Sequence, residues 1–344
     1  MASPPLAAVF PPLILGGAGF SYQHISNPTP EQTLEVLSRA FELGVRAIDT
    51  SPYYEPSEEL LGKALSHPDF ASRYNREEYL LITKVGRVSA EKSDYSPEWI
   101  RYSVRRSLER LKTSYLDVVF CHDIELVDEE SVLSAIGILL DLVKEGIIKY
   151  IGISGYPIPV LASVARRSLK MYNRPLDVIQ NWAQMTLQNN RLEESGLKAF
   201  KEAGVNCICS SSPLASGLLR DEGVPIAALG DWHPAPNGLR VAAHAAAAYV
   251  KDQDESLARW ALRYALLRAM KCSCSSSGGV KVATIMGGTS VGEIEDNVGT
   301  SLEVLSRHNG ELGWEFGREG SERDLELFAR VQEILGGWMD YSFA

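Results

Sequence analysis

Short apolar runs alternate with amphipathic stretches along almost the whole chain. The apolar runs are rich in aliphatic and β-branched residues and are bounded by turn residues, which is typical of strands. Eight such runs occur, over 13–17, 45–49, 79–84, 115–122, 148–154, 177–181, 205–210 and 282–286. Apolar positions at helical spacing predict helices over 31–43, 58–65, 97–112, 129–145, 158–171, 193–203, 241–251, 257–269, 293–306 and 322–335.

This alternation predicts the fold class. Strands that alternate with helices form parallel sheets with right-handed crossovers. Eight such units favour a closed (β/α)8 barrel, the TIM barrel, over an open doubly wound sheet. The glycine pattern of a dinucleotide-binding Rossmann unit does not follow the first predicted strand. No shift in composition marks a boundary, so we expect one α/β domain over 1–344, with a flexible segment over 1–12.

Three stretches depart from the simple alternation. After the seventh predicted strand, residues 214–239 are rich in Gly, Pro, Asp and Asn. A connector of this length is usually functional or disordered. The Ser/Gly-rich stretch 273–279 predicts a flexible connector. The helix predicted over 322–335 is an extra element at the C-terminal end of the barrel.

Composition and charge exclude several classes of protein. The chain has 344 residues, 45% of them hydrophobic, which is enough for a large core without disulfides. Lys and Arg number 34 against 44 Asp and Glu, and this acidic balance disfavours nucleic-acid binding. We expect no membrane span and no secretory signal, and the few cysteines favour a cytoplasmic protein. Cys272 and Cys274 have no second Cys/His pair at ligand spacing, so we predict no metal site.

Polar residues end several predicted strands, and in a (β/α)8 barrel the reactive groups lie at these ends. Asp49, Lys84 and His122 end the second, third and fourth strands, and Tyr54 lies on the loop after Asp49. A nearby ammonium favours the phenolate form of a tyrosine and lowers its pKa. A carboxylate would keep the lysine charged, and a histidine could polarise a substrate oxygen. Together the four residues predict proton transfer at a carbonyl or alcohol, although each alone also fits a structural role.

The motifs around these residues resemble the signature of the aldo-keto reductase family. They are AIDTSPYY at 47–54, ITKV at 82–85, LDVVFCH at 116–122, IGIS at 151–154, QN at 180–181, SPL at 212–214, GGT at 287–289 and EDN at 295–297. The resemblance implies a (β/α)8 barrel that binds a nicotinamide cofactor. It implies that Tyr54 is the general acid/base, that Lys84 and Asp49 tune it, and that His122 polarises the substrate oxygen.

The resemblance also implies which residues hold the cofactor. Ser154 and Gln180 match residues that bind the nicotinamide carboxamide, and Gly17 lies after the first strand. Ser211 stands where many members place an aromatic residue that stacks on the nicotinamide, so stacking is weaker or comes from elsewhere. The stretches expected at the pyrophosphate and adenosine contain Ser212, Leu214, Ser216, Gly217, Gly287, Gly288, Thr289, Asp296 and Asn297.

Glu293 bears on the choice of cofactor. Members that use NADPH commonly carry an arginine at this place, for the 2′-phosphate. A carboxylate would repel that phosphate and could accept a hydrogen bond from a free ribose 2′-hydroxyl. No Lys or Arg lies between Lys281 and Arg307. The sequence therefore predicts NAD; the alternative is that Glu293 is only a solvated acid in the first turn of a helix.

Further motifs resemble the sugar-dehydrogenase branch of the family: TKVGR at 83–87, HDIE at 122–125, ISGYP at 153–157 and LQNN at 187–190. This implies oxidation of an aldose at its anomeric carbon to an aldonolactone, as in erythroascorbate-type biosynthesis. D-Arabinose is the first candidate, and L-galactose and L-fucose are alternatives. The candidate substrate contacts are Tyr53, Asp123, Trp182 and Trp232, and for each of them packing at the rim is an equal alternative.

Two other functions stay open at this point. One is a general NADPH-dependent aldehyde reductase, and the other is a regulatory barrel subunit without catalytic activity. Glu293 and the sugar-branch motifs count against the first, and the complete set of four catalytic residues counts against the second. We expect a small-molecule substrate, no nucleic-acid or membrane partner, and a monomer or weak homodimer.

Overall fold

Eight parallel strands close into a barrel in the computed structural model, which describes residues 3–273, 279–316, 318 and 320–343. Each strand pairs with the next along the chain, and β8 pairs with β1. The strands are β1 (Leu13–Gly16), β2 (Ala47–Asp49), β3 (Leu80–Val85), β4 (Leu116–Cys121), β5 (Ile148–Gly155), β6 (Val178–Trp182), β7 (Cys207–Ser211) and β8 (Lys281–Met286). The predicted (β/α)8 barrel is confirmed.

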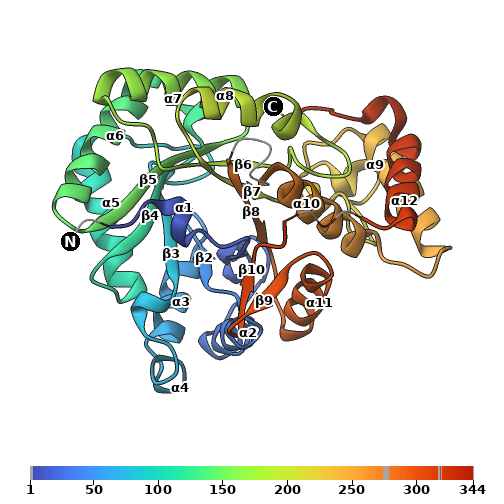
Figure 1. Ribbon diagram of the computed structural model, residues 1–344, viewed down its shortest axis with the longest axis horizontal. Coiled ribbons are helices and arrows are strands. Elements are labelled where there is room, and N and C mark those ends of the chain that lie inside the picture. Colours follow the sequence, from blue (N-terminus) through green and yellow to red (C-terminus); the bar gives the residue numbers. More distant parts are fainter. Residues whose placement is uncertain (1–2, 274–278, 317, 319, 344) are drawn as a thin grey trace.

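Helices surround the strands (Figure 1). They are α1 (Leu6–Val9), α2 (Pro30–Glu42), α3 (Ser57–Leu65), α4 (Pro68–Ala71), α5 (Pro97–Leu111), α6 (Glu129–Lys144), α7 (Ile158–Tyr172), α8 (Leu197–Glu202), α9 (Asn237–Lys251), α10 (Leu257–Ser273), α11 (Val291–Leu302) and α12 (Glu322–Leu335). Several begin at a side chain that accepts a hydrogen bond from the first turn, such as Thr29, Ser96 and Asp128. Such caps satisfy backbone donors that have no partner inside the helix.

The N-terminal segment closes the bottom of the barrel. Leu6 and Phe10 are 4% and 2% exposed, and they belong to the same cluster of buried residues as Ile82 and Val118 inside the barrel. The indole of Trp314 donates to the carbonyl oxygen of Phe10 at 2.9 Å. Within the Pro/Ala-rich stretch predicted to be flexible, 1–12, these two apolar side chains pack against the interior of the barrel.

A small hairpin follows α11, where the sequence predicted that the helix continues to 306. α11 ends at Leu302, and β9 (Ser306–His308) pairs antiparallel with β10 (Glu311–Gly313). Asn309 and Gly310 connect the two strands with φ values of 51° and 81°. Asn-Gly is the favoured pair for a two-residue hairpin turn, since both positions need positive φ. This local signal outweighs the helical spacing before it.

Two segments fold over the C-terminal ends of the strands. The long connector after β7 contains two short 3-10 turns, Ala215–Gly217 and Ala227–Gly230, and ends at α9, four residues before the predicted helix start. The chain beyond α12 returns to the stretch after β6, where the amide of Asp340 donates to the carbonyl of Gln188 at 2.8 Å. The predicted connector 273–279 falls mostly on 274–278, which lie outside the described residues.

Candidate active site

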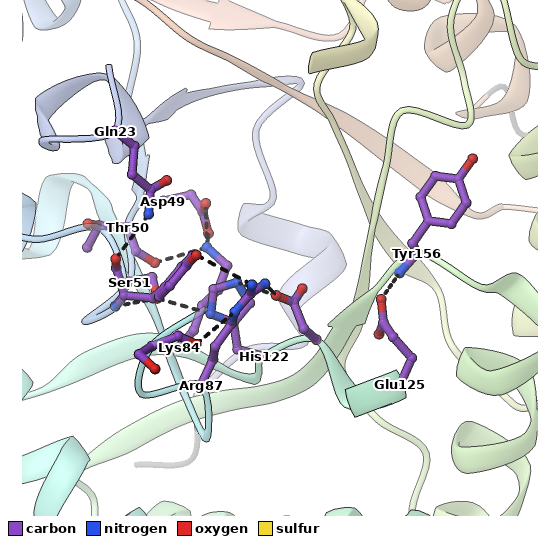
Figure 2. A network of polar contacts seen from close by, with 12 residues as sticks. Gln23, Asp49, Thr50, Ser51, Lys84, Arg87, His122, Glu125 and Tyr156 are labelled. Carbon is purple, nitrogen blue, oxygen red and sulfur yellow. Dashed lines mark hydrogen bonds and ion pairs between the residues drawn. The ribbon is translucent and has the colours of Figure 1, made fainter. Parts of the chain in front are cut away.

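Four side chains, from three neighbouring strands and the loop after β2, meet at the C-terminal end of the barrel, and Figure 2 shows three of them, Asp49, Lys84 and His122. Asp49 is the last residue of β2, Lys84 lies near the end of β3, and His122 directly follows β4. They are 3%, 1% and 4% exposed, and Tyr54 lies on the loop after β2. Because the strands are parallel, their C-terminal ends share one edge, and this geometry brings the four predicted residues together.

Lys84 and Asp49 form a buried ion pair. Nζ of Lys84 donates to both carboxylate oxygens of Asp49, at 2.8 and 2.7 Å, and to the carbonyl of Thr50 at 3.0 Å. Burial by itself would lower the pKa of Lys84, but the charge and hydrogen bonds of Asp49, together with Tyr54 and Asp123, outweigh burial and raise that pKa. The proton therefore stays on the lysine, and the site holds a fixed ammonium.

Tyr54 lies beside this ammonium, whose nitrogen is 5.0 Å from the centre of the tyrosine ring. The sequence led us to expect a lowered pKa for Tyr54. Burial instead raises the pKa of Tyr54, and the negative charges of Asp49 and Asp123 add to that rise, while Lys84 opposes it. The expected effect of the lysine is present, but removal from water is the larger contribution.

His122 packs against the ring of Tyr54. Its ring centre is 5.7 Å from that of Tyr54. Its backbone amide donates to the carbonyl of Val85 at 2.9 Å, and its carbonyl accepts from the hydroxyl of Tyr95 at 2.5 Å. Burial lowers the pKa of His122 to about 3, and the positive charges of Lys84 and Arg87 act in the same direction. The imidazole is therefore neutral at physiological pH and can offer one N–H donor and one acceptor.

Arg87 and Asp123 extend the site beyond His122, and Figure 2 shows Arg87 beside that histidine. The guanidinium of Arg87 binds the carboxylate of Asp123 and lies 4.2 Å from the centre of the Tyr53 ring. Oδ2 of Asp123 lies 3.6 Å from Nε2 of His122. The sequence predicted Tyr53 and Asp123 here but missed Arg87, although its place three residues after Lys84 in the TKVGR motif was a usable signal.

The end of β5 and β6 offers unpaired polar atoms that fit a carboxamide. Among the described residues, Oγ of Ser154 and Oε1 of Gln180 are buried and have no hydrogen-bond partner. Burial raises the pKa of Asp49, and the charge of Lys84 and a hydrogen bond from Gln180 oppose that rise, which fits a glutamine whose amide group faces Asp49. A hydroxyl donor and an amide acceptor are what the two ends of a primary carboxamide need. These two residues therefore fit the nicotinamide.

The stretch after β7 turns sharply where the pyrophosphate was predicted. Ser212, Ser216 and Gly217 have φ values of 56°, 57° and 96°, so the backbone folds back on itself within a few residues. Ser211, at the end of β7, offers only a hydroxyl, which lies 3.5 Å from the carbonyl of Asn181. Leu214 is half-buried between these turns. No aromatic side chain takes the place of Ser211 on β7.

The loop between β8 and α11 is open where the adenosine end was predicted. A Cβ added at Gly287 would meet no atom within 4 Å, so the backbone there is accessible. Gly288, by contrast, packs on Ile294, and Nδ2 of Asn297 donates to the carbonyl of Gly287 at 2.9 Å. Asp296 lies next to Asn297 on α11. Gly17, after β1, packs closely on Asp49 and Ser57 and supports the barrel mouth.

Glu293 is exposed, and it also forms hydrogen bonds with Thr289. Its Oε2 accepts from the amide and the hydroxyl of Thr289, at 2.7 and 2.9 Å, which fixes the loop before α11. His24 lies between two charges here, since burial and Arg220 lower its pKa while Glu293 raises it. The sequence missed Arg220, a cation contributed by the connector after β7.

The two tryptophans predicted to contact substrate lie in different environments. Trp182 is half-buried at the end of β6, 4.5 Å from the ring of Tyr156 and stacked at 6.2 Å on Phe343. Trp232 is 68% exposed and contacts only His233 among the described aromatic rings. The amide of Phe343 donates to the hydroxyl of Tyr156. The C-terminal segment therefore forms a wall next to Trp182, which sequence spacing could not show.

Fold and site together define a class. The sequence profile of the Aldo/keto reductase family matches residues 12–309, and the chain belongs to this family of oxidoreductases, which use nicotinamide cofactors. Among individual proteins, the chain is 38% identical to D-arabinose 1-dehydrogenase of Saccharomyces cerevisiae over 257 residues, which cover 74% of this chain and 75% of that one.

Two further relatives agree with this placement. L-galactose dehydrogenase of Arabidopsis thaliana is 33% identical over 308 residues, 89% of this chain and 84% of that one. The solved structure of a glycerol dehydrogenase from Gluconobacter oxydans superposes with a TM-score of 0.64 at 19% identity and covers 95% of this chain and 92% of that one. The latter likeness shows the fold alone.

The described residues contain neither a membrane-spanning helix nor a cluster of metal ligands. None of the helices there has the length and apolarity needed to cross a membrane. In the same part of the chain, no three His, Cys, Asp or Glu side chains gather into a possible metal site.

Proposed function

We propose that this protein is an NAD-dependent aldose 1-dehydrogenase that oxidises the anomeric hydroxyl of a cyclic aldose, D-arabinose first, to the aldonolactone. The observation that carries the proposal is the Lys84–Asp49 ion pair, buried against Tyr54 and facing a neutral His122. The two curated relatives named above are both sugar dehydrogenases by name. L-Galactose and L-fucose are the alternative substrates.

In this proposal some side chains transfer the proton and others orient the substrate. Tyr54 takes the proton of the C1 hydroxyl as the C1–H bond gives up its hydride, and the C1–O bond becomes the lactone carbonyl. The oxidised nicotinamide supplies the hydride acceptor when it is bound. Lys84 stabilises the phenolate form of Tyr54 by its charge, and Asp49 holds Lys84 in place. His122 donates to the same substrate oxygen and keeps it in reach of Tyr54.

The Arg87–Asp123 pair supports a polyhydroxylated substrate. Both side chains are partly exposed beside His122, so a bound substrate would cover them. An apolar aldehyde that covered these charged groups would leave their hydrogen-bond donors and acceptors without partners. Sugar hydroxyls, by contrast, can donate to Asp123 and accept from Arg87. This argument favours an aldose over a simple aldehyde.

Glu293 supports NAD over NADP. Its carboxylate lies at the start of α11 and keeps one oxygen, Oε1, beyond its contacts with Thr289. A 2′-phosphate there would meet a negative charge, while a ribose 2′-hydroxyl could donate to it. Arg220 brings a positive charge to the same region, where it lowers the pKa of His24 while Glu293 raises it.

Turnover assays test the proposal. The absorbance of NADH is followed with D-arabinose, L-galactose and L-fucose, each with NAD and with NADP. We expect turnover with NAD and the highest kcat/KM for D-arabinose. Reduction of simple aldehydes by NADPH without sugar oxidation would instead show a general reductase, and cofactor binding without turnover in either direction would show a regulatory barrel.

A further inference from the structure

Ser51 lies beneath the imidazole of His122, on the same loop as Tyr54 (Figure 2). Both residues are buried, with 1% and 4% of their surface exposed. Oγ of Ser51 lies 3.1 Å from Nδ1 of His122, and the amide of Tyr53 donates to the same Oγ at 3.1 Å. The serine hydroxyl therefore accepts a hydrogen bond from the backbone and also lies within hydrogen-bond distance of a ring nitrogen of His122.

From this arrangement we infer that Ser51 is a positioning residue that fixes His122 in the tautomer with its proton on Nε2, which faces the substrate. This inference deepens the proposed function, on which its catalytic consequence rests. In this tautomer Ser51 donates to Nδ1, and Nε2–H is the donor that remains for the substrate oxygen.

The opposite tautomer is disfavoured by the hydroxyl of Ser51. If Nδ1 carried the proton, Ser51 Oγ would accept two hydrogen bonds, and its own hydrogen would need another acceptor. Among the described residues the only partners of that hydroxyl are His122 and the amide of Tyr53, which is a donor. A buried hydroxyl hydrogen without an acceptor costs free energy.

The other ring nitrogen gives a second, independent reason. Nε2 of His122 lies 3.6 Å from Oδ2 of Asp123. A bare lone pair on Nε2 would face that carboxylate, whereas an N–H there is attracted to it. Arg87 binds the same Oδ2, which keeps the carboxylate occupied and leaves Nε2–H available to substrate. Ser51 and Asp123 therefore select the same tautomer from opposite sides of the ring.

The tautomer matters because His122 stays neutral. With its pKa near 3, the ring cannot act as a donor on both nitrogens at physiological pH. Only the neutral form with a proton on Nε2 can polarise a substrate oxygen in the site. Loss of Ser51 would leave the ring able to turn or to change tautomer, at a cost to orientation rather than to cofactor binding.

Nitrogen NMR tests the inference directly. The full chain is labelled with 15N-histidine, and the His122 signals are identified by their loss in a His122→Gln variant. We expect a protonated Nε2 and an unprotonated Nδ1 in the wild type at neutral pH. A proton on Nδ1 would overturn the inference. This measurement needs no turnover, so it stands even where the sugar assay fails and the proposed function is wrong.

Kinetics supply the second test. For Ser51→Ala we expect kcat of sugar oxidation to fall roughly fivefold, in line with the loss of one buried hydrogen bond, with the Kd of NAD unchanged. Ser51→Thr keeps the hydroxyl and should restore most of kcat. Ser168→Ala removes a serine equally buried on α7 and should leave kcat as in the wild type. An unchanged kcat in Ser51→Ala would contradict a positioning role.

Discussion

Lys84, Tyr54 and His122 are all shielded from water, and this burial affects the pKa of each of them in a different way. It would discharge Lys84, but Asp49 prevents this and keeps an ammonium in place. It raises the pKa of Tyr54, so the resting hydroxyl is protonated. It lowers the pKa of His122 to about 3, so the ring is neutral. At the residue scale, the site therefore combines one fixed positive charge with two neutral hydrogen-bonding groups.

The first prediction concerns the Tyr54 hydroxyl. Tyr54→Phe keeps the ring beside Lys84 and removes the group that exchanges a proton with substrate. We expect kcat to fall by roughly a thousandfold, the size typical of a lost general acid/base, while the Kd of NAD changes little. Turnover assays and fluorescence titration with cofactor measure the two quantities. Activity close to that of the wild type would exclude Tyr54 as the proton acceptor.

The raised pKa of Tyr54 predicts how the rate depends on pH. Oxidation needs the phenolate, which is the minor form below the pKa, so kcat should increase roughly tenfold per pH unit from neutral pH towards about pH 10. Aldehyde or lactone reduction needs the protonated form and should stay flat over that range. The charged groups around Tyr54 are Lys84, Asp49, Asp123 and Arg87. The pKa values of Lys84 and Arg87 are both raised, so these two cations keep their charge over this range.

The titration of His122 should not affect the same pH dependence of kcat. Its pKa near 3 places its titration far below the range of the assay. A plateau in oxidation that begins near neutral pH would show that another group, and not Tyr54 with a raised pKa, controls the proton transfer. Initial rates over a series of buffers at constant ionic strength provide the measurement.

At the scale of elements, the proposed preference for NAD depends on helix α11 and the loop before it. Glu293 repels a 2′-phosphate in the proposed arrangement and also accepts two hydrogen bonds from Thr289. We expect Glu293→Arg to raise the ratio of kcat/KM for NADP to that for NAD roughly tenfold, which is about 1.4 kcal/mol. Rates with both cofactors at saturating sugar give the ratio.

Glu293→Gln separates charge from loop structure, because an amide oxygen can still accept from Thr289. We expect this variant to fall between the wild type and Glu293→Arg. A second variant, Glu295→Gln, changes a carboxylate on the same helix that binds Arg39 instead, and should leave the cofactor ratio unchanged. A ratio that is the same in all four proteins would mean that Glu293 does not face the ribose.

At the scale of the whole molecule, one end of the barrel carries the candidate active site and the other contributes to stability. The C-terminal ends of the strands carry the polar site, and the N-terminal ends are closed by the segment that contains Leu6 and Phe10. Substitutions at the closed end should therefore change stability and leave catalysis alone.

Phe10 tests this division. Phe10→Ala should lower the free energy of unfolding by about 3 kcal/mol, since it empties a fully packed position, with kcat unchanged. Val9→Ala, at an adjacent side chain that is 44% exposed, should cost less than about 0.5 kcal/mol. Urea unfolding followed by circular dichroism measures both. Equal stability of the two variants would show that the segment only lies loosely on the barrel.

Much of the fold and of the proton-transfer site could be predicted from the sequence. The eight strands, and with them the barrel, follow from apolar runs of strand length, because buried parallel strands leave a clear local pattern. Asp49, Lys84 and His122 could be found because a strand end is a position in the sequence as well as in space. The turn at Asn309 and Gly310 carried a local signal too, but the prediction followed the helical spacing before it and extended the helix to 306.

The tertiary structure alone decided how these groups act on one another. The pKa of Tyr54 depends on how completely water is excluded, and the sequence showed only that a lysine follows in the next strand. The pairing of Arg87 with Asp123, the wall that Phe343 builds beside Trp182, and the burial of Phe10 all join residues far apart along the chain. Local patterns determined the elements and the residues at their ends, whereas burial and long-range contacts, which no local pattern encodes, determined charge, tautomer and the shape of the pocket.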